Sequence, residues 1–262
     1  MSASDCDLSG KTALIIGIAN RDSLAWAAAE RYRNAGARLA ITYLNDRAKP
    51  HVEPLADQVN ADLFLECDVT RPGSLDVVFD AIEADWGKLD IGLHSIASAP
   101  KADLQGRLID CSPDGFATAV QVSVYSLIHM ARRAEPLMRQ GGSLTTLSFY
   151  GAEKVVDHYN VMGPVKAALE GAVRYLAHEL GPANIRVNTI SAGPVATRAA
   201  SGINHFSELL DESARKSPLR RTVDASEVAK AALFFASDLS SGVTGETLHV
   251  DAGFHIDGMI FH

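Results

Sequence analysis

Short β-rich segments alternate with longer helical patterns along the length of the chain. The strand candidates occupy residues 13–16, 38–42, 61–66, 91–95, 143–148, 186–190 and 247–250. The helical patterns cover residues 23–35, 74–86, 114–140, 160–180 and 225–237. This alternation is typical of βαβ units, and nearly continuous apolar strands indicate burial on both faces. The pattern therefore predicts an α/β fold, a doubly wound parallel seven-stranded sheet with helices on both faces.

No feature of the sequence marks a boundary between domains. It has no Pro/Gly/Ser-rich linker, internal repeat or low-complexity run, and a chain of 262 residues can bury one sizeable core. We therefore expect residues 1–262 to form a single domain. Residues 194–218 mix small, aromatic and charged side chains without a firm period. We interpret about 195–216 as a mobile substrate flap.

The composition limits the classes of partner. A formal net charge of −8 disfavours nucleic acid or an anionic membrane surface. The first five residues lack the basic and apolar regions of a secretory signal, and the apolar runs are too short to span a bilayer. Cys6, Cys67 and Cys111 are widely spaced, which suits a reducing compartment and gives no metal pattern. We expect a cytoplasmic protein with no metal site and no membrane or nucleic acid partner.

A tyrosine and a lysine stand seven residues apart at Tyr159 and Lys166. Seven residues advance a helix by about 700°, so both side chains would leave nearly one face, roughly 10 Å apart along the axis. A nearby cation favours the phenolate and makes the hydroxyl a better proton donor. The pair is therefore a candidate catalytic pair. The alternative is that the two side chains share a face without a chemical role.

Several loops at the predicted carboxyl edge of the sheet have features of a dinucleotide site, since ligands bind beyond the strand ends in such folds. Gly17 lets the backbone turn close to a ligand, and Ser23 would cap a helix whose N-terminus suits a pyrophosphate. An ordinary strand–helix turn would look the same. Asp68 could bind an adenine amino group or simply cap a helix. Residues 94–97 are small enough to pass close to a cofactor, and residues 192–197 could grip its carboxamide and phosphate.

These residues, in this order, resemble the enoyl-acyl-carrier-protein reductase branch of the short-chain dehydrogenase/reductase superfamily. The resemblance runs from Gly10 to Phe254 and is most specific at Tyr159-x6-Lys166, at residues 186–194 and in the Gly17-x5-Ser23 loop. Most of the superfamily spaces Tyr and Lys four apart, but position 163 is Gly here. The longer spacing separates this branch from the ketone reductases.

The resemblance implies a single Rossmann-type dinucleotide-binding domain that reduces the trans-2 double bond of an enoyl thioester with NADH in fatty-acid synthesis. Tyr159 would hydrogen-bond the thioester carbonyl, and Lys166 would hold the nicotinamide ribose. The positions that would contact the cofactor are Gly17, Ser23, Leu24, Leu44, Asp68, Val69, Ser95, Ile96, Lys166, Val195 and Thr197. Those around the substrate are Ala97, Ala99, Phe149, Tyr159, Met162, Ala199 and Phe206. The resemblance also implies a homotetramer that packs residues 114–140 and 160–180 between subunits.

The sequence departs from the family pattern at two places near the cofactor and the substrate. Many members carry a second tyrosine where this chain has Phe149. Adjacent side chains on an extended segment point opposite ways, so Tyr150 should not replace it. Leu44 stands where a polar adenine contact is common. Positions 44 and 45 carry no basic residue that could bind the 2′-phosphate of NADPH, and this absence favours NADH. Arg47 and Lys49 are close enough in sequence that NADPH is still a possible cofactor.

The flap raises a question about the carrier of the acyl chain. Acyl carrier protein is strongly acidic, whereas the flap contains Glu208, Asp211 and Glu212, and like charges disfavour binding. The basic residues that could supply a docking patch are Arg215, Lys216, Arg220 and Arg221. Acyl carrier protein is the family expectation, and a CoA thioester is the alternative.

Three residues near the pair have more than one interpretation. Pro164 requires a helix that begins close to Tyr159 or bends there. Met162 is a pocket wall or core packing, and Phe206 is a pocket wall or an anchor for the flap. Two other functions also stay open, a short-chain reductase of ketones or other activated alkenes and a non-catalytic dinucleotide-binding regulator.

Overall fold

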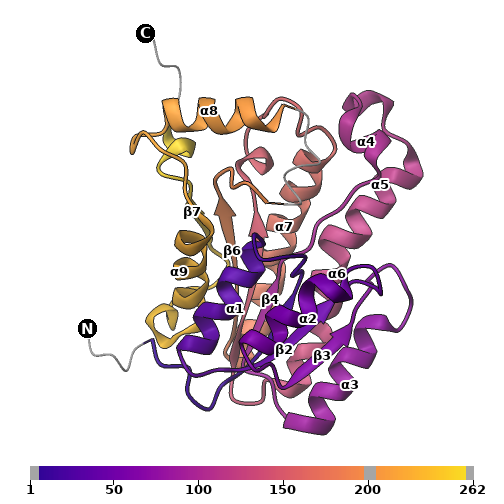
Figure 1. Ribbon diagram of the computed structural model, residues 1–262, viewed down its shortest axis with the longest axis vertical. Helices are drawn as coiled ribbons and strands as arrows, with labels where there is room; N and C mark the ends of the chain where they lie inside the picture. The colour runs from indigo at the N-terminus through magenta and orange to yellow at the C-terminus, as the bar shows by residue number, and fades with distance from the viewer. Residues whose placement is uncertain (1–5, 198–204, 258–262) are drawn as a thin grey trace.

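The computed structural model describes residues 6–197 and 205–257, and its centre is a parallel sheet (Figure 1). The strands are β1 (Thr12–Ile16), β2 (Arg38–Tyr43), β3 (Leu63–Glu66), β4 (Ile91–His94), β5 (Gly142–Ser148), β6 (Ile185–Ala192) and β7 (Thr247–Val250). They form one seven-stranded sheet in the order β3-β2-β1-β4-β5-β6-β7, and every pairing is parallel. The predicted fold class is confirmed.

Helices pack on both faces of this sheet. They are α1 (Leu24–Asn34), α2 (Lys49–Gln58), α3 (Ser74–Trp86), α4 (Lys101–Gln105), α5 (Pro113–Val120), α6 (Ser126–Ala134), α7 (Met162–Leu180), α8 (Phe206–Lys216) and α9 (Ala225–Ala236). One apolar cluster joins α1, α2 and α9 to the sheet, and a second joins α3, α5, α6 and α7. Because apolar side chains project from both faces of the sheet, helices can pack against each face.

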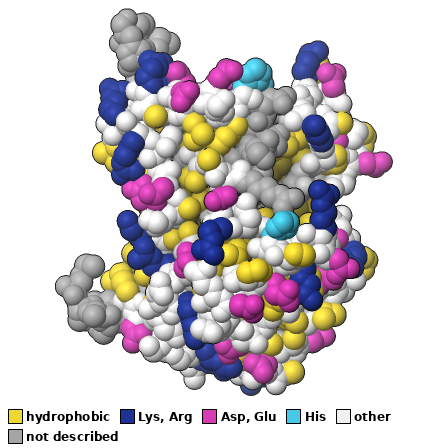
Figure 2. Space-filling model, viewed as in Figure 1, with side chains coloured by type: hydrophobic (Ala, Val, Ile, Leu, Met, Phe, Trp, Pro, Cys, Tyr) yellow, Lys and Arg dark blue, Asp and Glu magenta, His cyan; other side chains and the backbone are white. Residues whose placement is uncertain are grey.

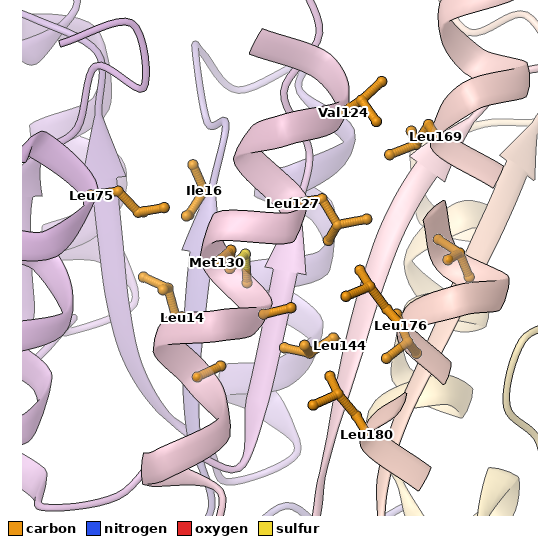
Figure 3. Packing of buried hydrophobic residues seen from close by; sticks show 14 of the residues in the cluster. Leu14, Ile16, Leu75, Val124, Leu127, Met130, Leu144, Leu169, Leu176 and Leu180 are labelled. Atoms are coloured by element: carbon orange, nitrogen blue, oxygen red, sulfur yellow. The ribbon is translucent and has the colours of Figure 1, made fainter. Parts of the chain in front are cut away.

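The second cluster shows how the sheet fixes the helix that follows Tyr159. Leu14 of β1 and Leu144 of β5 meet Leu127 and Met130 from the α6 side, while Leu169 lies on α7 (Figure 3). All five are fully buried. Burying each such side chain stabilises the fold by roughly 1.5–3 kcal/mol. The buried face of α7 is therefore packed against the sheet.

Three helices were not predicted from the sequence. The segment Lys49–Gln58 is helical although it contains Pro50 and Pro54, which lower the helical signal of a pattern. The short helix Lys101–Gln105 follows β4. The third, Phe206–Lys216, lies within the segment interpreted as a mobile substrate flap, so part of that segment is a helix, and its role as a flap stays a prediction. It lies across the carboxyl end of the sheet (Figure 1).

Two predicted helices have different bounds. The segment predicted as one helix over 114–140 consists of α5, a π-helical turn at Gln121–Tyr125, α6 and a 3₁₀ turn at Glu135–Leu137. The helix predicted from 160 begins at Met162. Pro164 therefore falls in its first turn, where a missing N–H breaks no helical hydrogen bond. Tyr159 precedes the helix, so the argument that Tyr159 and Lys166 share a helical face is wrong.

The described part of the surface carries charges of both signs. On the face in Figure 2, Lys and Arg side chains are interspersed with Asp and Glu. None of the described helices is long and apolar enough to cross a bilayer. Within residues 6–197 and 205–257, no group of three or more His, Cys, Asp or Glu side chains is arranged to hold a metal ion.

Candidate active site

A cavity of about 230 Å³ lies at the carboxyl edge of the sheet, where the chain order reverses between β1 and β4. Such a reversal point is where ligands bind in open α/β sheets. The cavity is lined by Gly17, Ala19, Ser23, Leu24, Ser95, Ile96, Ala97, Ser98, Ala99, Leu104, Leu147, Ser148, Phe149, Tyr159, Met162, Lys166, Ala192, Gly193, Pro194, Val195, Thr197, Phe206 and Leu209. Apolar side chains gather beneath α8 on the outer surface (Figure 2).

The loop after β1 approaches the loop after β4 very closely. Gly17 has a φ of +112°, and a Cβ there would lie 2.0 Å from the carbonyl oxygen of Ser95. The position therefore needs glycine for its conformation and for its space. The close contact brings the two cofactor-candidate loops into one wall of the cavity.

Ser23 occupies the N-cap position of α1, but its hydroxyl does not cap the helix. Ser23 Oγ instead accepts hydrogen bonds from the N–H groups of Ala19 at 3.0 Å and Asn20 at 3.1 Å. The predicted capping bond is therefore wrong, because the hydroxyl oxygen already accepts hydrogen bonds from the preceding loop. This arrangement fixes the loop and leaves the first turn of α1 for an anion.

The substitution Gly17→Ala is expected to destabilise the protein by more than about 2 kcal/mol and to abolish cofactor binding. The new methyl group combines an unfavourable φ with a clash against Ser95. Gly10→Ala is the matched control, since Gly10 has a φ of +78° and a Cβ added there would meet nothing within 4 Å. Thermal unfolding and a cofactor titration measure both. Equal losses in the two variants would contradict the close contact as the cause.

Tyr159 is held firmly in the cavity wall. Its side chain is 7% exposed, and its ring meets the edge of Phe149 with centroids 4.8 Å apart. The backbone of Gly151 lies against the ring, since a Cβ there would be 2.3 Å from Tyr159 Cδ1. Burial, followed by the charge of Glu170, raises the pKa of Tyr159 above its ordinary value. The predicted shift toward phenolate is therefore wrong, because burial disfavours the charged form; the phenol stays a neutral hydrogen-bond donor.

Lys166 brings a buried cation to the same cavity. The residue is 6% exposed, and its Nζ donates a hydrogen bond to the carbonyl oxygen of Leu147 at 2.7 Å. Burial lowers the pKa of Lys166 to about 8, and the nearby Glu170 opposes that shift. The ammonium is consequently held in place and is available to a ligand that supplies hydroxyl groups.

The cavity brings together most of the residues predicted to bind cofactor or substrate. Those that line it are Gly17, Ser23, Leu24, Ser95, Ile96, Lys166, Val195 and Thr197 on the cofactor side, and Ala97, Ala99, Phe149, Tyr159, Met162 and Phe206 on the substrate side. Ala199 lies outside the described residues. Both predicted groups thus share one cavity wall.

Three residues predicted to contact the cofactor are not among the cavity-lining residues. Leu44 is 52% exposed beyond β2. Val69 packs partly buried against the core. Asp68 accepts hydrogen bonds from the N–H and hydroxyl of Thr70 and pairs with Arg71 at 3.6 Å. The carboxylate of Asp68 therefore stabilises its own turn and does not cap α3, whose N-cap residue is Gly73; its contact with a cofactor stays a prediction.

The structure shows the surroundings of Met162, Phe206 and the Phe149–Tyr150 pair. Met162 lines the cavity and belongs to the buried core, so both interpretations hold. Phe206 lines the cavity from the first turn of α8. Phe149 and Tyr150 diverge, since Phe149 packs on Tyr159 and Tyr150 packs edge-on against Phe254 with centroids 5.6 Å apart. Tyr150 does not take the place of a second pocket tyrosine.

Sequence reasoning missed part of the cavity wall. The additional lining residues are Ser98, Leu104, Leu147, Ser148 and Leu209. Leu147 and Ser148 end β5, so the rule for strand carboxyl ends could have found them. Leu104 and Leu209 come from α4 and α8, and no sequence signal placed those two helices at the site.

The basic residues near the end of α8 are engaged in local ion pairs. Glu212 lies 2.8 Å from both Arg215 and Lys216, and these two cations lower the pKa of Glu212 to about 2. Arg221 pairs with Glu227 at 2.7 Å. The acidic and basic residues of this segment therefore partly neutralise one another.

Comparisons with known proteins agree on one family. A family model described as Enoyl-(Acyl carrier protein) reductase matches residues 17–255. Enoyl-[acyl-carrier-protein] reductase [NADH] 1 of Rhizobium meliloti is 51% identical over 252 residues, which cover 96% of this chain and 93% of that protein. The Nostoc enzyme of the same name, FabI, is 47% identical over 97% of this chain and 99% of its own length.

Solved structures give the same result. The reductase of Anaplasma phagocytophilum, in complex with NAD, has a TM-score of 0.93 and 49% identity, with 96% of each chain covered. The enzyme of Bacillus cereus, with NADP+ and indole naphthyridinone, has a TM-score of 0.93 and 45% identity over 96% of this chain and 99% of that chain. The likeness therefore extends over nearly the whole chain.

Proposed function

Because this chain belongs to the enoyl-acyl-carrier-protein reductases, we propose that its cavity binds NADH beside an enoyl thioester, with Tyr159 and Lys166 as the catalytic pair. The reaction is NADH-dependent reduction of enoyl-acyl carrier protein in fatty-acid synthesis. The observation that carries the assignment of residues is that Tyr159, Lys166 and the glycine loop after β1 line one cavity at the reversal point of the sheet.

The residues on the cofactor side fit a dinucleotide. Gly17 presents a backbone without a Cβ, and the α1 N-terminus behind it keeps its first turn free of a side-chain cap. Both features suit a pyrophosphate. Lys166 would bind the nicotinamide ribose hydroxyls, while Ser95, Ile96, Val195 and Thr197 would flank the nicotinamide half.

The chemistry divides between the cofactor and the protein. Bound NADH supplies a hydride to C3 of the enoyl thioester. Tyr159 donates a hydrogen bond to the thioester carbonyl as negative charge develops on its oxygen, which stabilises the transition state more than the substrate. Burial keeps that phenol protonated and therefore able to donate. The ammonium of Lys166 adds a positive field in the same cavity.

Apolar side chains on the substrate side would exclude water and hold the acyl chain. Ala97 and Ala99 follow β4, Phe149 follows β5, and Met162 and Phe206 begin α7 and α8. A low-dielectric wall strengthens the hydrogen bond from Tyr159 to a developing oxyanion. Ala199 is proposed to complete this wall.

The cofactor is NADH, as the names of the relatives state. A relative's structure contains NADP+, whose 2′-phosphate is a ligand for basic residues such as those after β2. Lys49 lies 4.0 Å from Glu53 and over the ring of Tyr43. Leu44, Asp68 and Val69 are proposed to border the adenosine half beyond the cavity. An apolar Leu44 offers no charge to a 2′-phosphate, which favours NADH.

We assign acyl carrier protein as the carrier, with docking at the end of α8. Arg215, Lys216, Arg220 and Arg221 lie together in this segment, and Glu212 and Glu227 reduce its positive charge. A modest patch of this kind would steer an acidic partner at low salt. A CoA thioester would still reach the same cavity.

The experiment that tests the function follows NADH oxidation with crotonyl-CoA, with a longer trans-2-enoyl-CoA and with the matching acyl carrier protein thioester. Turnover of the enoyl substrates, fastest with the carrier protein, is expected. Turnover of a 3-oxo thioester in place of the enoyl one would favour a ketone reductase. Cofactor binding without turnover of any of them would favour a regulatory protein.

The chain is further proposed to form a homotetramer of single domains in the cytoplasm, with substrate access through the segment 195–216. Apolar side chains remain exposed on the helices expected between subunits: Phe116 42%, Tyr125 51%, Ile128 38% and Tyr175 75%. Exposed apolar patches commonly mark subunit interfaces. Light scattering is expected to give a mass near four times 27.9 kDa, and Tyr175→Glu to lower it. A monomeric wild-type mass would contradict the assembly.

A further inference from the structure

A buried carboxyl group adjoins the cavity and has no role in the function proposed above. Glu170 lies one helical turn after Lys166 on α7 and is 7% exposed. Its Oε1 accepts a hydrogen bond from Ser148 Oγ at 2.5 Å. Ser148 itself lines the cavity at the end of β5. A buried carboxyl therefore connects directly to a hydroxyl that faces the substrate space.

Charged and polar side chains, one of them solvent-exposed, surround the carboxyl of Glu170. The charges of Glu153, His249 and Arg174 all act on this carboxyl. Glu153 is 42% exposed and its Oε1 lies 2.9 Å from Nε2 of His249, although the two are not aligned as a hydrogen bond. His249 stacks on His255, with ring centroids 3.9 Å apart. Glu153 and His249 thus form an ion-pair contact near Glu170 whose acidic member is exposed to solvent.

The reaction itself creates a need for such a group. Addition of a hydride to C3 leaves an enolate, and the saturated product forms only when C2 gains a proton. One proton must therefore reach C2 in the cavity in every catalytic cycle. Tyr159 and Lys166 are both buried, and Lys166 Nζ donates a hydrogen bond to the carbonyl oxygen of Leu147, so another group is needed to bring the proton from solvent.

We propose that Ser148 and Glu170 form a proton relay that delivers the C2 proton from solvent, an inference that rests on the proposed enoyl reduction. For this transfer Glu170 is protonated and donates to Ser148 Oγ, the reverse of the hydrogen bond in the structure, in which the hydroxyl donates to Oε1. The Ser148 hydroxyl proton then passes to the enolate as the Glu170 carboxyl proton passes to Ser148 Oγ. The enolate electron pair forms the new C2–H bond, and Glu170 is left as a carboxylate. Water near Glu153 and His249 then returns a proton to Glu170.

The surroundings of Glu170 suit a carboxyl that binds and releases a proton. Burial raises its pKa above the ordinary value, and the Ser148 hydroxyl opposes this. Glu153 raises the pKa further, whereas His249 and Arg174 lower it. Lys166 on the same helix and Tyr159 ahead of it are the other titratable groups whose charge couples to this carboxyl. A raised pKa keeps a larger fraction of Glu170 protonated near neutral pH, so that the carboxyl can act as a general acid.

The competing explanation is that Glu170 only keeps Lys166 charged. That role predicts weaker NADH binding when the carboxylate is removed, because the pKa of Lys166 would fall further. A relay instead predicts intact NADH binding with slow protonation. NADH titrations from pH 6 to 9 separate the two roles, because a lost Lys166 charge would make the variant's NADH affinity recover as the pH falls, whereas a relay defect leaves that affinity unchanged throughout.

The test compares the wild type with Glu170→Gln and Ser148→Ala, using a trans-2-enoyl-CoA and saturating NADH. Glu179→Gln is the matched control, since Glu179 is exposed on the same helix. In both relay variants we expect kcat to fall on the order of 10²-fold, with the NADH Kd within about twofold. The solvent isotope effect on kcat should increase, and Glu170→Gln should lose the limb in which wild-type kcat falls as pH rises through the pKa of Glu170.

A second readout does not depend on turnover. Infrared difference spectra of wild type against Glu170→Gln should show a protonated carboxyl that titrates above the ordinary glutamate range. An unchanged kcat and isotope effect in Glu170→Gln, or a carboxyl that titrates in the ordinary range, would overturn the relay. So would a loss of NADH affinity equal to the loss of rate. If Glu170→Gln does not fold, Ser148→Ala decides by the same rate and isotope criteria. A wild type without enoyl turnover would contradict the proposed function instead, and the infrared titration would still decide the state of Glu170.

Discussion

Tyr159→Phe is expected to lower kcat by about 10²–10³-fold, the loss typical of one removed oxyanion donor. The substitution removes only the hydroxyl. The phenylalanine ring can keep its edge contact with Phe149 and its packing against Gly151, so the fold and the cofactor side of the cavity should be unaffected. Steady-state kinetics and an NADH titration measure the two quantities, and the NADH Kd should change by less than about twofold.

Tyr175→Phe is the control for this experiment. Tyr175 lies on α7, outside the cavity-lining residues, and phenylalanine keeps the apolar ring that the proposed subunit interface uses, so loss of its hydroxyl should leave kcat unchanged. Wild-type turnover by Tyr159→Phe would remove Tyr159 from the mechanism. A large loss of NADH affinity would instead assign the hydroxyl to the cofactor.

Lys166→Ala is expected to weaken NADH binding and also to lower kcat, each by on the order of tenfold or more, since a charged hydrogen bond contributes about 1.5–3 kcal/mol. The substitution removes the cation of the cavity and leaves the carbonyl oxygen of Leu147 without its lysine donor. An equilibrium titration of NADH and steady-state kinetics measure the two losses. Lys230→Ala, at an exposed position of α9, should change neither.

The same lysine predicts a pH dependence of cofactor binding. Burial lowers the pKa of Lys166 from 10.5 to about 8, so the ammonium is present below that pH and is lost as the pH rises through it. Wild-type NADH affinity should therefore fall above about pH 8, and the affinity of Lys166→Ala should not follow this transition. A wild-type affinity that stays constant up to about pH 10, near the ordinary lysine pKa, would contradict a role for the ammonium in holding the cofactor.

The architecture was predictable because strands and helices of this chain have distinct patterns. All seven predicted strands form, and all lie in one parallel sheet. The helix at Lys49–Gln58 was missed because Pro50 and Pro54 oppose its pattern, although burial of Val52 and Leu55 against the sheet outweighs their cost. The helix at Phe206–Lys216 was missed because charged residues dominate its sequence.

Much of the candidate site followed from the rule that strand carboxyl ends meet at one edge. That rule placed Gly17, Ser95 and Val195 in one cavity although they are far apart in sequence. It could not predict burial, which decides the direction of the pKa shifts at Tyr159 and Lys166. Nor could it predict that Ser23 bonds its own loop, or that Ser148 meets Glu170, because both depend on side-chain positions in three dimensions.

The central claim is that this chain adds a hydride from NADH to C3 of an enoyl thioester and a solvent proton to C2. The most direct test is mass spectrometry of the product formed from a trans-2-enoyl thioester, with C4-dideuterated NADH in ordinary water and with ordinary NADH in heavy water. We predict one deuterium at C3 in the first reaction and one at C2 in the second. Deuterium absent from C3 in the first product, or no saturated thioester in either reaction, would contradict the claim.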